Sequence, residues 1–257
     1  MDIWQACKDS FSHQTLGGQL VRVVESQEQV ATNYLVKTLD EQHMLEQMLE
    51  SNKPHPTAEA NSFTNKQTLH YLLATPFRYP PLKYGSRFGK KTEPSLLYAS
   101  RNVSTALAES AYYRFVFWRG MQTPPSSNKF ITQHTVWGAN YYTNKGVSLH
   151  TSPFNDYSQQ LTAPDSYQHS QALGAELRGA GIQAFEFTSA RDVAQGLNVA
   201  LFTPQPLANK QPSYQQQWLC DTSNDEVVFY SGSDKAIYNF SIDQFLVDKK
   251  FIMQAVS

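Results

Sequence analysis

The stretch that organises this chain is FRYPPLKYGSRFGKKTEPSLLYASRNVSTALAE, residues 77–109. It combines cations with aromatic rings, two glycines and two carboxylates. Its six cations are Arg78, Lys83, Arg87, Lys90, Lys91 and Arg101. Cations, rings that can stack and an acid within one short stretch suit an anionic ligand that carries a ring, such as a nucleotide.

The same stretch predicts a loop, a strand and a helix, in that order. Two glycines flank the basic residue of the segment 85–89, which is a loop signature. The apolar run 95–99 follows a proline and predicts a strand. A helix is predicted from Thr105 to Trp118, with Asn102 or Ser104 as its N-cap and a glycine after its end.

Arg87, Tyr98 and Glu109 follow one another at equal steps of eleven residues, on the loop, the strand and the helix. Glu109 lies between two apolar triplets, 106–108 and 111–113. A carboxylate in such surroundings is costly to bury unless it is paired or functional. The periodicity alone also leaves open a surface position on the outer face of an amphipathic helix.

The composition is that of a globular protein of 257 residues, with 40% hydrophobic and 17% charged residues. This length allows one large domain or two small ones. A formal net charge of −1 argues against nucleic-acid binding through bulk positive charge.

Several local signals are missing from the sequence. Cys7 and Cys220 lie far apart and form no CxxC pair, which fits a reducing cytoplasm. The N-terminal residues MDIWQACKDSF lack the features of a signal peptide, and no apolar run approaches the length of a membrane span. The seven histidines show no ligand spacing, so we expect no metal site.

Outside the central stretch, strands outnumber helices and do not alternate strictly with them, which predicts an α+β fold with mixed or antiparallel sheets and flanking helices. Strands are predicted at 131–137, 147–150, 182–187, 198–203, 218–220, 226–230, 237–240 and 251–256, and a helix from Pro164 to Leu177.

The N-terminal region is interpreted separately. Leu20–Val24 reads as a short strand or helix, and Thr38 with Glu41 matches a capping box ahead of an amphipathic helix. We interpret residues 1–65 as a helical extension packed on the main domain, residues 66–257, because so short a segment buries too little surface to be stable alone.

The ordered fragments GSRF (85–88), LYAS (97–100) and TALAE (105–109) resemble the RES-domain proteins, a family named for an Arg, a Glu and a Ser. The fragments FTSAR (187–191) and GLNVAL (196–201) follow in the same order and supply the serine. The resemblance covers roughly residues 72–204, with further strands in 205–257. RES-domain proteins are bacterial NAD-degrading toxins of type II toxin–antitoxin pairs. The resemblance therefore implies a fold similar to ADP-ribosyltransferases and a cytoplasmic enzyme that cleaves the nicotinamide–ribose bond of NAD+.

The resemblance also implies roles for particular residues. Glu109 and Arg87 would be catalytic, with Glu109 beside the nicotinamide ribose and Arg87 on the phosphates. Tyr98 would lie in the NAD pocket, where it could stack on a ring or hydrogen-bond a ribose. Ser189 and Asn198 would bind the ligand through hydrogen bonds.

Arg78 and Tyr79 resemble the Arg-Tyr pair that opens the family motif and are expected to bind the ligand, although they precede Arg87 by only nine and eight residues. NAD+ would be a substrate rather than a resident cofactor, with water or inorganic phosphate as acceptor. Phosphate would favour extra cations near the ribose, which Arg78 and Lys83 could supply.

The resemblance implies a helix-turn-helix antitoxin as the protein partner, without direct nucleic-acid binding and without a membrane, and it leaves self-association into a homo-oligomer open. Two other functional classes also remain open. One is an ADP-ribosyltransferase that modifies a protein, for which the same Arg, Tyr and Glu would serve. The other is a non-catalytic module that binds a nucleotide.

Overall fold

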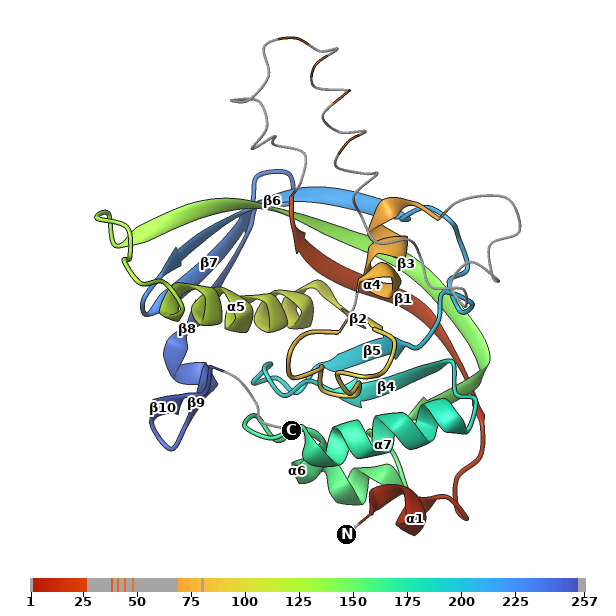
Figure 1. Cartoon of the computed structure of the whole chain (residues 1–257). Coiled ribbons are helices and arrows are strands. Elements are labelled where there is room, and N and C mark those ends of the chain that lie inside the picture. Colours follow the sequence, from red (N-terminus) through yellow and green to blue (C-terminus); the bar gives the residue numbers. More distant parts are fainter. Residues whose placement is uncertain are drawn as a thin grey trace.

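Figure 1 shows the computed structural model, which describes residues 2–26, 69–79 and 81–253 and the single positions 38, 41, 44 and 48. The strands are β1 (Gln14–Glu25), β2 (Leu97–Ser100), β3 (Lys129–Ser148), β4 (Ala184–Thr188), β5 (Leu197–Leu201), β6 (Tyr214–Ser223), β7 (Glu226–Ser231), β8 (Ala236–Ser241), β9 (Leu246–Val247) and β10 (Lys250–Phe251). The helices are α1 (Ile3–Cys7), α4 (Tyr71–Arg78), α5 (Val103–Arg119), α6 (Ser158–Leu161) and α7 (Gln168–Gly179), with 3-10 turns η2 (Phe154–Tyr157) and η3 (Ile242–Phe245).

Eight strands form one sheet in the order β1-β2-β5-β4-β3-β6-β7-β8. β1 also pairs with β3, so the first five strands of this order close into a ring, and β6, β7 and β8 extend from it. Closure removes the free strand edges that an open sheet would expose. β3 and β4 are parallel and the other described pairs are antiparallel, so the predicted α+β class with a mixed sheet is confirmed.

Helices cover this sheet at separate places (Figure 1). α5 packs against β6, β7 and β8 through fully buried side chains such as Leu107 and Phe115. α7 packs Leu173 and Leu177 in a cluster with Phe185 of β4. α4 contributes to a third cluster, together with side chains of all five strands of the ring, β1 to β5.

β3 is one strand of 20 residues, where the sequence predicts two separate strands. Residues 138–146, the polar run between the two predicted strands, pair with β1, from Gly138 opposite Val21 to Gly146 opposite Gln14. A distant strand thus satisfies backbone groups whose local composition favours a loop. The prediction of two strands is therefore wrong.

β1 also corrects the interpretation of residues 1–65 as a helical extension. Residues 14–25 lie in the closed ring between β2 and β3, so they belong to the main sheet. Thr38 and Glu41 exchange the two hydrogen bonds of the predicted capping box, each 3.2 Å long. Most of residues 27–68 lie outside the described residues, so the packing of this extension stays a prediction.

α5 has the predicted ends. The Asn102 side chain accepts the Thr105 N–H at 2.8 Å, and the N–H of Gly120 bonds to carbonyls of the last turn. The helix begins at Val103, slightly earlier than predicted. These ends place Glu109 in the second turn, on a side of α5 that faces β5.

α7 begins at Gln168 and not at the predicted Pro164. The carbonyl groups of Ala163 and Pro164 accept hydrogen bonds from arginine side chains of other segments. These contacts hold the segment before α7 in a non-helical conformation, which is the physical reason for the later start.

The remaining strand predictions are largely confirmed. Those at 182–187, 198–203, 218–220, 226–230 and 237–240 overlap β4 to β8. The strand predicted at 251–256 is seen only at its first residue, in β10, and residues 254–257 lie outside the described ones. Cys7 and Cys220 are buried free thiols. Among the described residues, no helix has both the length and the apolar character needed to cross a bilayer.

Candidate active site

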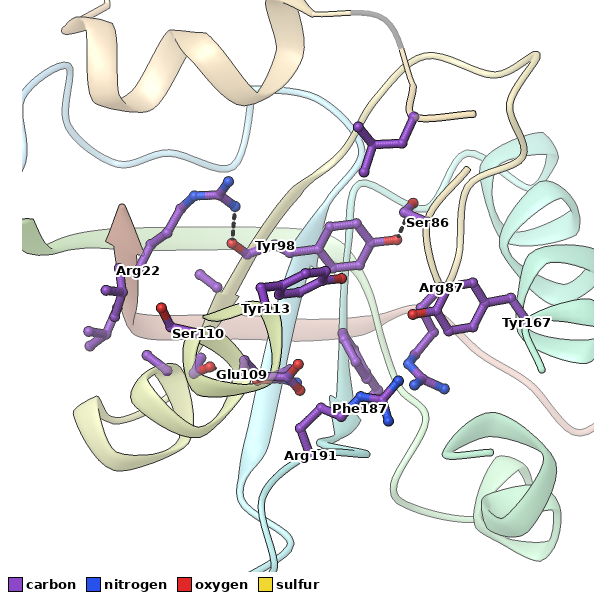
Figure 2. Close-up of a pocket in the computed structure, with 17 residues that line it drawn as sticks. Arg22, Ser86, Arg87, Tyr98, Glu109, Ser110, Tyr113, Tyr167, Phe187 and Arg191 are labelled. Atoms are coloured by element: carbon purple, nitrogen blue, oxygen red, sulfur yellow. Dashed lines mark hydrogen bonds between the residues drawn. The ribbon is translucent and has the colours of Figure 1, made fainter. Parts of the chain in front are cut away.

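A cavity of about 390 Å³ lies among β1, β2, α5, β5 and the loops that precede β2 and follow β4 (Figure 2). Its volume is within the range of ordinary small-molecule sites. The described residues that line it are Val21, Arg22, Val23, Leu82, Ser86, Arg87, Tyr98, Ala99, Ser100, Ala106, Glu109, Ser110, Tyr113, Tyr167, Phe187, Arg191 and Asn198. Three arginines and one carboxylate carry the charge of this lining, so the cavity is positive as a whole.

Glu109 is anchored through one of its two carboxylate oxygens. Oε1 accepts the Ser189 hydroxyl and the Asn198 side-chain amide, each at 2.6 Å. The Ser100 hydroxyl donates to Oδ1 of Asn198 at 2.6 Å, which orients that amide with its N–H toward Glu109. No described residue donates to Oε2, and Figure 2 shows the carboxylate directed toward the space that Arg191 borders.

Ser189 stands behind Glu109 and does not line the cavity. Its side chain is almost fully buried, and its Oγ accepts the backbone N–H groups of Arg191 and Asp192 at 3.1 and 3.0 Å. The hydroxyl therefore ties the turn after β4 to the carboxylate. This position differs from the predicted direct contact with the ligand.

Tyr98 holds the loop that precedes β2. Its hydroxyl accepts the Phe88 N–H at 2.9 Å and lies 3.0 Å from Oγ of Ser86. Burial raises the pKa of Tyr98 to about 12, so the hydroxyl keeps its proton at neutral pH. Gly85 has a φ of 71°, and an added Cβ would lie 2.3 Å from the Gly89 carbonyl oxygen, so the loop requires glycine there.

Two arginines reach the cavity from different loops and bond to the same short segment. Arg87 donates to the carbonyls of Leu161 and Ala163, at 3.2 and 2.9 Å. Arg191 donates to the carbonyl of Pro164 at 2.9 Å. Figure 2 shows both guanidinium groups on the same side of the cavity.

Arg22 reaches the cavity from β1, away from the other two arginines (Figure 2). β1 and β2 share one register pair, Val21 with Ser100. The Arg22 guanidinium donates a hydrogen bond to the backbone carbonyl of Tyr98 in β2. Burial lowers the pKa of Arg22, which reflects the cost of keeping its charge away from water.

The structure gathers most of the predicted site residues and leaves two of them outside. Arg87, Tyr98, Glu109 and Asn198 line the cavity. Arg78 and Tyr79, at the end of α4, do not, and the Tyr79 side chain is exposed. Lys83 is likewise not among the lining residues. Within the described part of the chain, no three His, Cys, Asp or Glu side chains are grouped as a metal site requires.

The cavity residues that were not identified from the sequence include Arg22, Tyr113, Tyr167 and Arg191. Three of these four carried a usable signal. Arg22 is a cation within the apolar run LVRVV, and Tyr113 follows Glu109 by four residues, which places both on one side of a helix. Arg191 ends the fragment FTSAR, two residues after the motif serine, whereas Tyr167 carried no signal, because only the fold brings it to the cavity.

A comparison of the sequence with models of protein families gives a match. The sequence matches the family model described as RES domain over residues 64–223. This range includes every described residue that lines the cavity except the three from β1. A comparison with curated proteins returned no match. Because the family match covers more than half of the chain, the protein belongs to the RES domain family.

Proposed function

We propose that the protein degrades NAD+ by cleaving the bond between nicotinamide and ribose, with water or inorganic phosphate as the acceptor. The observation that carries this proposal is the setting of Glu109, a single carboxylate in a cavity with three arginines and several aromatic rings. One of its oxygens is anchored and the other has no described donor. Membership of the RES domain family supports the same class of substrate.

One carboxylate is enough for this reaction because of the charge of the leaving group. The nicotinamide nitrogen that is bonded to ribose is positively charged in NAD+. When the bond breaks, its electron pair goes to that nitrogen, nicotinamide leaves neutral, and the positive charge moves to the ribose. No general acid is needed, whereas glycosidases that act on neutral sugars use two carboxylates.

Glu109 would stabilise the positive charge that develops on the ribose. Ser189 and Asn198 hold Oε1, so the carboxylate needs little reorganisation when this charge appears. A preorganised contact of this kind is typically worth about 3–4 kcal/mol in the transition state. The acceptor then bonds to the same ribose carbon, and water in that role releases one proton to the solvent.

The rest of the lining suits the other parts of NAD+. Arg87 offers N–H donors to phosphate oxygens, for which a guanidinium is well shaped. The rings of Tyr98, Tyr113 and Tyr167 offer apolar faces against which a base or a nicotinamide can stack.

The test is to incubate purified protein with NAD+, with and without inorganic phosphate, and to measure nicotinamide release. ADP-ribose as product identifies water as the acceptor, and a phosphorylated ADP-ribose identifies phosphate. A labelled protein would instead support the ADP-ribosyltransferase alternative. NAD+ that stays intact in both buffers, with a folded sample, contradicts cleavage with water or phosphate as acceptor and leaves the transferase and the binding module.

We further propose that the protein is the toxin of a toxin–antitoxin pair with a helix-turn-helix antitoxin. Expression without a partner should deplete cellular NAD+ and arrest growth, whereas the Glu109→Gln variant should be tolerated. Growth arrest at normal NAD+ levels would contradict this link between the reaction and toxicity.

A further inference from the structure

We propose that Arg191 and Arg87 together form a clamp for a diphosphate group. This inference rests on the proposed function for the identity of the molecule that carries the diphosphate. It adds a second arginine to the site and identifies the segment of residues 161–164 as the element that aligns the two side chains. The ligand class at this end of the cavity is a nucleoside diphosphate.

Arg191 is a nearly buried cation to which the described residues offer no carboxylate partner. Its exposed fraction is 5%, and it lines the cavity. Its guanidinium donates to the Pro164 carbonyl and lies over the ring of Tyr112, with 3.6 Å from Cζ to the ring centroid. No carboxylate in the described residues forms an ion pair with it. A carbonyl and an aromatic face can hold a guanidinium, but they do not neutralise its charge.

Arg87 is held in the same way. Its Nη1 donates to two carbonyls, those of Leu161 and Ala163, and its guanidinium lies 4.8 Å from the ring centroid of Tyr167. It also forms no ion pair within the described part of the chain. Both arginines thus combine carbonyl acceptors on one side with an aromatic ring on the other.

The shared segment makes these two cations a pair. Carbonyls of Leu161, Ala163 and Pro164 receive all the hydrogen bonds that the two guanidinium groups donate within the described protein. Two like charges that bond to adjacent carbonyls repel each other, and an anion between them removes the repulsion. Each guanidinium has five N–H donors, so both retain donors for a ligand. A diphosphate, with charged oxygens on two adjacent phosphorus atoms, matches two such groups.

The clamp is linked to Glu109 through one turn. The Ser189 hydroxyl donates to Glu109 and accepts the backbone N–H of Arg191, two residues later. The position of the Arg191 backbone is therefore tied to that of the carboxylate. A diphosphate held by Arg191 would place the ribose attached to it at a defined distance from Glu109, which is the geometry that cleavage at that ribose requires.

The test compares binding of ADP with binding of adenosine by calorimetry, so that only the diphosphate differs. The wild-type protein should bind ADP at least about tenfold more tightly than adenosine. Arg191→Gln and Arg87→Gln should each weaken ADP binding by about 10- to 100-fold, the range for a lost hydrogen bond to a charged group, and leave adenosine binding within about twofold.

Arg178 provides a matched control. Its guanidinium also donates to a proline carbonyl, that of Pro94 at 2.8 Å, and lies over the ring of Phe202 at 4.5 Å. It does not line the cavity. Arg178→Gln should therefore leave the affinity for ADP unchanged. Arg191→Lys keeps the charge but not the planar fork, and should give an intermediate loss.

Two results would overturn the inference. One is an affinity for ADP in Arg191→Gln that equals the wild-type value at an equal thermal midpoint. The other is a wild-type protein that binds ADP no better than adenosine. If Arg191→Gln does not fold, the affinity of Arg191→Lys for ADP is compared with the wild-type value instead, and equal affinities at equal thermal midpoints overturn the inference.

Nicotinamide release separates this inference from the proposed function. ADP binding that depends on Arg191, in a protein that leaves NAD+ intact, would retain the clamp and refute the proposed reaction. NAD+ cleavage with a wild-type KM in Arg191→Gln would retain the reaction and refute the clamp.

Discussion

The hydroxyl of Ser189 donates to Oε1 of Glu109 at 2.6 Å, across 80 positions of the sequence. The same oxygen of Ser189 accepts two backbone N–H groups, so its hydrogen-bonding capacity is nearly filled by the protein itself. Ser189 is therefore a positioning residue for the carboxylate and for the turn that carries Arg191. The serine of the family motif lies behind the cavity in this chain.

Glu109→Gln should reduce nicotinamide release by about two to three powers of ten with little change in KM. The variant keeps the size and the hydrogen-bonding oxygen of the side chain but loses the charge that would stabilise the ribosyl cation. Glu176→Gln, an exposed change on α7, is the control and should have the wild-type rate. Equal rates for both variants at equal thermal midpoints would exclude Glu109 from the mechanism.

Ser189→Ala should lower kcat by about tenfold and leave KM near the wild-type value, because it removes one of two hydrogen bonds that position Glu109. Steady-state kinetics on NAD+ would measure both constants. Ser127→Ala, in an exposed loop, removes a hydroxyl of the same kind that does not line the cavity and should change neither constant. A selective rise in KM would show that Ser189 contacts the ligand after all.

Arg22→Gln should raise the KM for NAD+ more than Arg78→Gln does. Arg22 lines the cavity, whereas Arg78 does not. Loss of a charged hydrogen-bond donor to the ligand costs about 1.5–3 kcal/mol, which corresponds to roughly 10- to 100-fold in affinity. If the Arg78 variant has the larger effect at an unchanged thermal midpoint, the ligand extends toward the end of α4.

Tyr98→Phe should destabilise the protein by about 1–3 kcal/mol, since the Phe88 N–H loses its acceptor in a partly buried site. The loop that carries Arg87 should also become less ordered, so KM should rise. Denaturant unfolding and kinetics on the same sample would measure the two effects. Unchanged stability would mean that another group, such as the Ser86 hydroxyl, replaces the lost acceptor.

Stability should fall on mild acidification because of His134. Burial, with a smaller contribution from Arg114, lowers the pKa of His134 to about 4 from 6.5. Between these values the unfolded state binds more protons, so this residue's contribution is complete above pH 6.5 and is lost as the pH falls toward 4, by about 3 kcal/mol in total. Urea unfolding at pH 7.5 and 5 should show the loss, and His134→Gln should reduce it. If the free energy of unfolding falls equally in both proteins between pH 7.5 and 5, titratable groups other than His134 cause the loss.

The sequence alone determined the local elements around the site. The loop at 85–89, the strand at 97–100 and the caps of α5 depend on glycine conformations, apolar runs and a capping side chain within a few residues, so they can be read without the fold. The motifs also identified the family and four of the residues that line the cavity.

The tertiary structure alone decided the neighbours of these elements. Residues 138–146 form part of a strand only because β1 pairs with them, and Ser189 lies behind Glu109 only because β5 lies between β2 and β4. Arg191 meets Arg87 through carbonyls of the segment before α7. Such contacts join positions tens of residues apart, and strand order and side-chain packing set them, whereas local sequence patterns report only on the residues next to them.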